Sequence, residues 1–138
     1  MRNLFALLLL CPLLTACLGG VDVGPGLDEI SRGFSESMRW SDFPNAAAYV
    51  HPDARAAFIE QFREDADLHV VDSHILSIDM HKQEGRADAV YVMEYYHLPS
   101  SRILKWRWEQ RWRLIKEQMT KPGVWLIENE PPTLPWKK

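Results

Sequence analysis

The apolar residues that follow position 26 first recur with a helical spacing. One face of this predicted helix carries Leu27, Ile30, Phe34 and Met38. Asp28 and Glu29 suit its positive N-terminal end, and the pattern stops near Trp40. The segment is therefore predicted to be an amphipathic helix with one face toward a core.

Two shorter helices are predicted next. Ser41 suits the N-cap of a short helix that runs through residues 46–48 and stops near His51. Pro52 suits the first turn of a third helix, because the N–H that proline lacks is not needed there. The apolar face of this helix is formed by Ala54, Phe58 and Phe62. It is expected to end among the charged residues 63–65.

After residue 67 the pattern changes to that of strands, with β-branched and aromatic residues between regularly spaced turns. The predicted strands cover residues 68–80, 87–98, 104–114 and 124–128. The predicted turns between them lie at residues 82–85, 99–101 and 121–123.

The third strand has the clearest pattern. One face is formed by Leu104, Trp106, Trp108, Gln110, Trp112 and Leu114. The alternate positions are charged, and they are Lys105, Arg107, Glu109, Arg111 and Arg113. A helix would scatter these tryptophans around its circumference, whereas a strand gathers them on one side. The pattern therefore predicts a strand with one buried face.

This order of elements predicts an α+β domain over residues 27–131, in which three N-terminal helices pack on a curved antiparallel four-stranded sheet. The proline-rich tail 132–138 is expected to be extended and loosely held. We find no internal repeat and no second domain in the sequence.

The first 16 residues are typical of a secretion signal. A basic start at Arg2 precedes an apolar run over residues 4–14, and small residues follow at Thr15 and Ala16. The run is shorter than the roughly 20 residues that a permanent transmembrane helix needs. The sequence therefore predicts cleavage and a different kind of anchor.

The tetrapeptide Leu14-Thr15-Ala16-Cys17 resembles the lipobox of bacterial lipoproteins. The resemblance implies cleavage before Cys17, a thioether-linked diacylglycerol on its thiol and an acyl group on the new N-terminus. A plain secretory signal with a chance cysteine is the alternative. Residues 17–26 are rich in glycine and form a predicted tether. Because Leu18, and not aspartate, follows the cysteine, the resemblance also implies the outer membrane, with the domain facing the periplasm.

Charge and cysteine content narrow the possible partners. The whole chain has 16 basic and 19 acidic residues, and the signal removes only Arg2, so the net charge falls from −3 to −4 on cleavage. Phosphate binding needs a basic surface, so a nucleic-acid partner is not expected. Cys11 leaves with the signal, and Cys17 alone cannot form an internal disulfide.

The order of helices and strands resembles the nuclear transport factor 2-like cone fold, with Trp112 and Trp125 in fitting places. A cystatin-like sheet is the rival. In the cone family, sheet and helices enclose a pocket that some members use for isomerase, dehydratase or cyclase chemistry, while others only bind or assemble. The fold alone does not choose among these functions.

The first predicted strand carries the residues most suited to chemistry. Asp72 and His74 share a strand face, and we consider them as a general acid and base pair lining the cone. Their polar neighbours are His69, Asp79 and His81. A zinc site usually needs three or four protein ligands, and the spacing offers only pairs, so no metal is predicted. A partly exposed strand without a catalytic role is the plainer interpretation.

A second set of residues is considered as the lining of a ligand pocket. Gln110 is expected on the inner face, opposite Glu94 or Tyr95. The indoles of Trp106, Trp108 and Trp112 suit either a ligand or, more commonly, a core. The basic positions between them suit anionic lipid or an acidic partner, although a solvated face is the plainer interpretation.

The sequence thus predicts a lipid-anchored, non-enzymatic domain of the bacterial envelope. Its expected partners are the bilayer, through Cys17, and an envelope protein or a small ligand. No cofactor is expected apart from the covalent lipid. A small hydrolase, isomerase or cyclase that uses Asp72 and His74 is one alternative, and a subunit of an envelope assembly is another.

Overall fold

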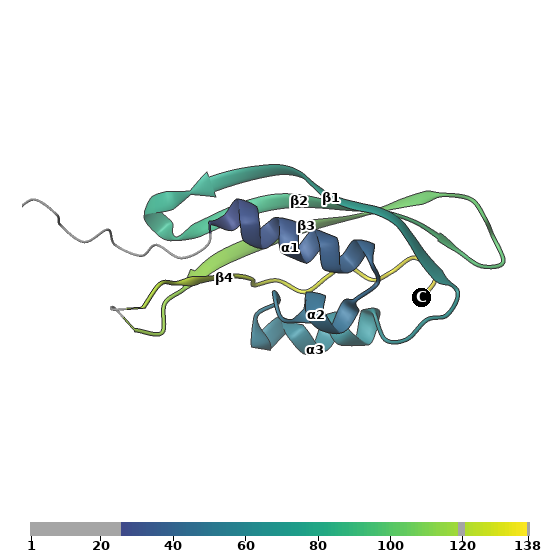
Figure 1. Cartoon of the computed structure of the whole chain (residues 1–138), viewed down its shortest axis with the longest axis horizontal. Helices are drawn as coiled ribbons and strands as arrows, with labels where there is room; N and C mark the ends of the chain where they lie inside the picture. Colours follow the sequence, from purple (N-terminus) through teal and green to yellow (C-terminus); the bar gives the residue numbers. More distant parts are fainter. Residues whose placement is uncertain (1–25, 119–120, 138) are drawn as a thin grey trace, which may run out of the picture.

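A computed structural model describes residues 26–118 and 121–137 of the chain (Figure 1). Its elements, in chain order, are α1 (Leu27–Arg39), α2 (Phe43–Ala47), α3 (Pro52–Gln61), β1 (Leu68–His81), β2 (Arg86–His97), β3 (Leu104–Ile115) and β4 (Val124–Ile127). The predicted signal, the lipobox with Cys17, and the tether up to residue 25 lie outside the described residues. Among the described helices, none has the length and apolar character needed to cross a membrane.

The α+β prediction is confirmed at the level of three α-helices and a curled antiparallel four-stranded sheet. The strand order is β1-β2-β3-β4, so each strand pairs with its neighbour in the chain. A short 3-10 helix, η1 (Lys82–Glu84), lies between β1 and β2, so not every helical element precedes the sheet. Gly85 ends it with a left-handed φ of 60°.

The start of α2 corrects one prediction. Asp42, and not Ser41, is the N-cap, because its carboxylate accepts a hydrogen bond from the N–H of Asn45 at 3.2 Å. Ser41 has a φ of 57°, a left-handed conformation that ends α1 and is unsuited to an N-cap. For α3, Pro52 occupies the first turn as predicted.

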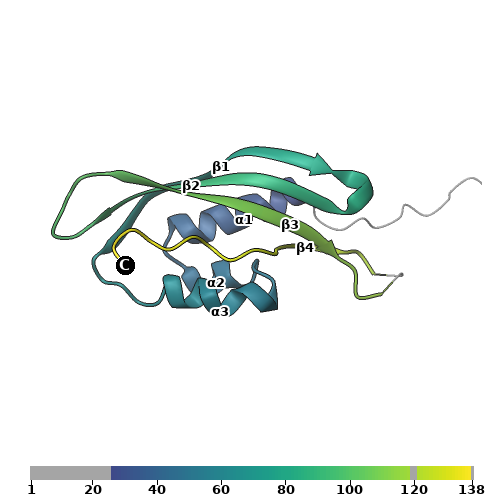
Figure 2. The ribbon, with the colours of Figure 1, turned by 180° about the vertical axis from the view of Figure 1, so that it is seen from behind.

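Burial along β3 alternates as the sequence predicted from Trp106 to Trp112, whereas Leu104, which was expected on the buried face, is 43% exposed. Trp106, Trp108 and Trp112 are 5%, 1% and 0% exposed, and the charged residues between them are exposed. The helices cover this face of the sheet, as the two opposite views show (Figure 1, Figure 2). Phe34 of α1 meets Trp108 and Trp112 edge-on, with ring centroids 6.1 and 6.3 Å apart. The inner face of the sheet is thus filled with aromatic side chains.

The C-terminal tail is not loosely held, which corrects the prediction. Leu134 is fully buried, and its N–H donates to Oε1 of Gln61 at 3.1 Å. The indole of Trp136 lies against His97, with ring centroids 4.7 Å apart, and its N–H donates to Asp65 at 2.9 Å. Tail residues carry apolar surface that α3 and the sheet bury, so the packed body continues past residue 131.

Candidate functional site

Asp72 and His74 lie on the outer face of the sheet and not in its interior. Strand register places Asp72 opposite Glu94, and Glu94 opposite Lys105, whose neighbour Trp106 faces the core. The two side chains are 40% and 43% exposed, and their nearest polar atoms are 3.2 Å apart. The prediction that they line the cone is therefore wrong, because register sends them to the opposite face.

The other histidines of β1 also form separate contacts. His69 stacks on Tyr96, with centroids 4.7 Å apart. Nε2 of His81 lies 3.0 Å from a carboxylate oxygen of Asp88 and 3.5 Å from one of Asp79. These contacts tie each ring to a neighbour on the outer face, and they do not converge with His74.

A cluster that the sequence analysis did not identify lies beside the C-terminal tail. Asp65, Asp67 and His97 offer ligand atoms within 4.8 Å of one another. Oδ2 of Asp65 is already engaged, however, because it lies 3.1 Å from His97 Nε2 and accepts the indole N–H of Trp136. These contacts hold the tail in place, and they explain the cluster without a metal ion.

The predicted pocket residues are mostly core residues. Tyr95 and Gln110 are each 1% exposed, like the tryptophans of β3. Gln110 lies opposite Ala89, and not opposite Glu94 or Tyr95. Glu94 is on the other face, where it forms an ion pair with Lys105 at 2.9 Å. The expected pairing of Gln110 with Glu94 or Tyr95 inside the cone is therefore not found.

A largely apolar hollow of the described surface lies outside the cone, between α2 and α3. Its volume is about 540 Å³, within the range of small-molecule sites. The apolar part of its wall is formed by Phe43, Pro44, Ala47, Ala48, Ile59 and Phe62. We call it the α2–α3 groove. Successive residues of α3 point to different faces of the helix. Phe58 is fully buried in the core, whereas Ile59 is 48% exposed in the groove.

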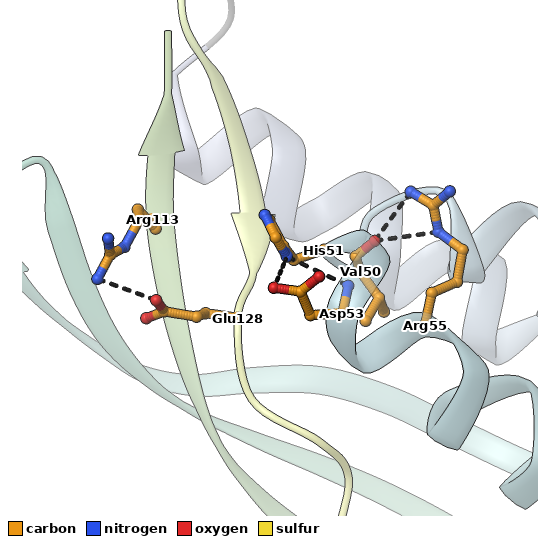
Figure 3. Close-up of polar contacts among 6 residues, drawn as sticks. All are labelled: Val50, His51, Asp53, Arg55, Arg113 and Glu128. Carbon is orange, nitrogen blue, oxygen red and sulfur yellow. Dashed lines mark hydrogen bonds and ion pairs between the residues drawn. The ribbon is translucent and has the colours of Figure 1, made fainter.

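Backbone pairing explains why a cation is fixed in this groove. Val50 forms a parallel bridge with Ile127, through the N–H of His51 and the carbonyl of Tyr49. The carbonyl of Val50 is therefore free to accept from Arg55, at 3.2 Å from Nε and 3.0 Å from Nη2 (Figure 3). Nε of Arg55 also donates to the carbonyl of Ala47, at 3.1 Å. These contacts fix the guanidinium and leave its other N–H groups for a ligand.

The other end of the groove carries one cation and two carboxylates. Arg63 and Glu60 form an ion pair at 2.6 Å, and Glu64 also lines the groove. Arg55 has no carboxylate within ion-pair distance among residues 26–118 and 121–137. The groove therefore combines an apolar wall with one fixed cation that forms no ion pair among the described residues.

Sequence reasoning missed this groove. The only signal was Ile59, an apolar residue beside the predicted face of Ala54, Phe58 and Phe62. The sequence does not show how α2 packs beside this helix; in the structure the bridge between Val50 and Ile127 holds the segment that joins α2 to α3. Comparison of the chain with known protein families, with curated proteins and with solved structures finds no match.

Proposed function

We propose that the protein is a lipid-anchored lipoprotein of the bacterial envelope, whose folded domain binds a small molecule with an apolar body and an anionic group. The observation that carries the binding function is the α2–α3 groove, in which the fixed guanidinium of Arg55 adjoins the exposed side chain of Ile59. An apolar wall with one oriented polar group is a common design of ligand sites.

The anchor is proposed from the tetrapeptide that ends in Cys17. Two or three acyl chains hold a protein on a bilayer durably, since each buried methylene contributes about 0.8 kcal/mol. Metabolic labelling with an alkyne-bearing palmitate should mark the wild type and Cys11→Ser but not Cys17→Ser. Labelled Cys17→Ser protein would contradict the anchor. Because Leu18, and not aspartate, follows Cys17, we propose that the protein is attached to the outer membrane and faces the periplasm.

The ligand class is tested with two soluble probes of similar size and opposite charge, 4-phenylbutyrate and 4-phenylbutylamine. In NMR titrations of the full chain we expect the carboxylate to shift the Ile59 methyl and Arg55 Nε–H signals, and to bind more tightly than the amine. A charge-assisted hydrogen bond is worth about 1.5–3 kcal/mol, so the preference should be tenfold or more.

Two variants separate ligand binding from folding. Ile59→Asp places a charge on an exposed position, so the protein should fold and lose affinity for the carboxylate. Arg55→Gln should lose the preference for carboxylate over amine. Arg32→Gln, which changes an exposed arginine of α1, is the matched control. Equal affinity for the two probes in the wild type would refute the proposed ligand class.

We further propose that the fold belongs to the cone class of nuclear transport factor 2-like domains. The order of three helices before an antiparallel meander supports this assignment. Enzymatic use of Asp72 and His74 is the second candidate. Their mutual contact favours it, as does the ion pair of Asp72 with Arg39 of α1 at 3.8 Å. Because both lie on the open outer face, where water is not excluded, the binding function is better supported.

A further inference from the structure

The α2–α3 groove has two distinct ends, because α2 and α3 run along it in opposite directions (Figure 1). Phe43, at the start of α2, lies against Phe62 at the end of α3, with ring centroids 5.1 Å apart. The carbonyl of Ala47, at the end of α2, accepts from Nε of Arg55 in the first turn of α3. One end of the groove is therefore at Arg55, and the other lies past Phe62, where residues 63–64 line it.

The Arg55 end of the groove is positive. The guanidinium is fixed by main-chain carbonyls, and it forms no ion pair within residues 26–118 and 121–137. Asp53 is the acidic residue nearest to it in the sequence, but Asp53 lies 3.5 Å from Nδ1 of His51 and does not line the groove. The N-terminal end of α3 adds a positive partial charge on the same side.

The opposite end of the groove is negative. Glu60 and Arg63 form an ion pair with each other, whereas Glu64 is exposed, lines the groove and pairs with no cation in the described part of the chain. Lys137 approaches from the tail, where its Nζ donates to the carbonyl of Glu60 at 3.1 Å, and it does not line the groove. The C-terminal end of α3 adds a negative partial charge, and the opposed dipole of α2 comes from only five residues.

The separation of the two charged ends suits a short extended chain. An α-helix rises about 1.5 Å per residue, so Arg55 and Phe62 lie about 10 Å apart along α3. An extended peptide rises about 3.3 Å per residue, so about three residues cover this span. Between the ends the wall is apolar, and Ile59 is exposed in its middle. The groove therefore matches a ligand with a charge at each end and apolar side chains between them.

We propose that the ligand of the α2–α3 groove is a short apolar peptide with both termini free. Its C-terminal carboxylate lies at Arg55 and its N-terminal ammonium at Glu64. Capture of a free chain terminus by fixed polar groups is a recurring mode of peptide recognition. The inference rests on the proposed binding of an anionic group at Arg55, and it adds to that function a second charge, a length and a direction.

The test is an NMR titration of the full chain with three forms of one tripeptide: Leu-Ala-Leu with free ends, its N-acetylated form and its C-terminal amide. The free peptide should bind about twofold to fivefold more tightly than the acetylated form, which is the contribution of one exposed ion pair. It should bind tenfold or more tightly than the amide, which lacks the carboxylate for Arg55. Acetylation should change the shift of the Glu64 amide, and amidation that of Arg55 Nε–H, which gives the direction of the peptide.

A charge-removing variant at the negative end gives the decisive comparison. Glu64→Gln changes an exposed side chain, and it should abolish the preference for the free over the acetylated peptide. Its affinity for 4-phenylbutyrate should stay within about twofold, because an exposed charge some 10 Å away contributes little through water. Glu36→Gln, at an exposed position of α1, is the matched control and should keep the preference.

Four results would overturn the proposal: no binding at millimolar tripeptide, equal affinity for the free and acetylated forms, a preference that persists in Glu64→Gln, or an effect of acetylation at Arg55 instead of Glu64. In each case the preference of the wild type for 4-phenylbutyrate over 4-phenylbutylamine is measured on the same sample. A retained preference would leave the anion site at Arg55 standing without the peptide, so the failure of this inference is distinguishable from failure of the proposed function.

Discussion

The indole N–H of Trp112 donates a hydrogen bond to Oε1 of Gln110 at 3.0 Å, and both side chains lie on the buried face of β3. Residues two apart on a strand point to the same side, so the buried indole N–H of Trp112 finds its acceptor on the same strand. The Nε2 atom of Gln110 is buried and has no partner among the described residues. The side-chain amide of Gln110 is therefore buried with its oxygen hydrogen-bonded and its nitrogen without a partner among the described residues.

We predict that substitutions of Gln110 and Trp112 have non-additive effects on the free energy of unfolding. Gln110→Leu removes an unpaired buried donor but leaves the Trp112 N–H without an acceptor, so its net effect on the free energy of unfolding should be small. Trp112→Phe should destabilise more, because it also removes packing. In the double variant the two effects should fail to add by about 1 kcal/mol. Urea unfolding of the four proteins measures this coupling, and strictly additive effects would show that the hydrogen bond contributes nothing.

The tail is predicted to be part of the stable core. Leu134→Ala removes a fully buried side chain and should lower the free energy of unfolding by about 2–4 kcal/mol. Pro132→Ala, at an exposed position of the same tail, is the control and should change stability little. Thermal or urea unfolding gives both values. A Leu134→Ala protein as stable as the wild type would show that the tail is not packed in solution.

The contact between the tail and Asp65 should weaken in acid. Burial acts to raise the pKa of Asp65, but hydrogen bonds from His97, Trp136 and the Asp67 N–H, together with the charge of His97, outweigh it and lower the pKa. The stabilisation is therefore present above the pKa of about 3.9 of an unfolded aspartate, and it is lost as pH falls through the lower folded value.

The indole N–H signal of Trp136 reports this loss directly. In NMR spectra its chemical shift should move toward that of an exposed indole as the pH falls through the lowered pKa of folded Asp65. Asp65→Asn should remove this pH dependence, while the control Asp53→Asn, at an exposed carboxylate, should retain it. A Trp136 signal that titrates equally in Asp65→Asn would assign the effect to another group.

Gly85 is required by its backbone conformation and not by lack of space. Its φ is 60°, and an added Cβ would meet only Leu114, at an ordinary distance of 3.6 Å. Gly85→Ala should therefore cost about 1 kcal/mol of stability through left-handed strain. Gly85→Asn should cost less, because asparagine tolerates this region. Calorimetry of the two variants tests the order, and equal losses would point to packing instead.

The sequence by itself determined most of the secondary structure and the inner face of the sheet. The 3.6-residue repeat of α1 and the two-residue repeat of β3 are local patterns, and burial of Phe34 and Trp108 followed from them. The proposed lipidation of Cys17 also rests on sequence alone.

Tertiary structure decided the sites. Register, which no single strand encodes, sent Asp72 to the outer face by placing it opposite Glu94. The bridge between Val50 and Ile127 turned a carbonyl toward Arg55 and so fixed a cation in the α2–α3 groove. Long-range packing also drew Leu134 into the core, because burying apolar surface outweighs the local preference of a proline-rich tail for an extended chain. Local patterns fix elements, whereas contacts between distant segments decide which side chains meet.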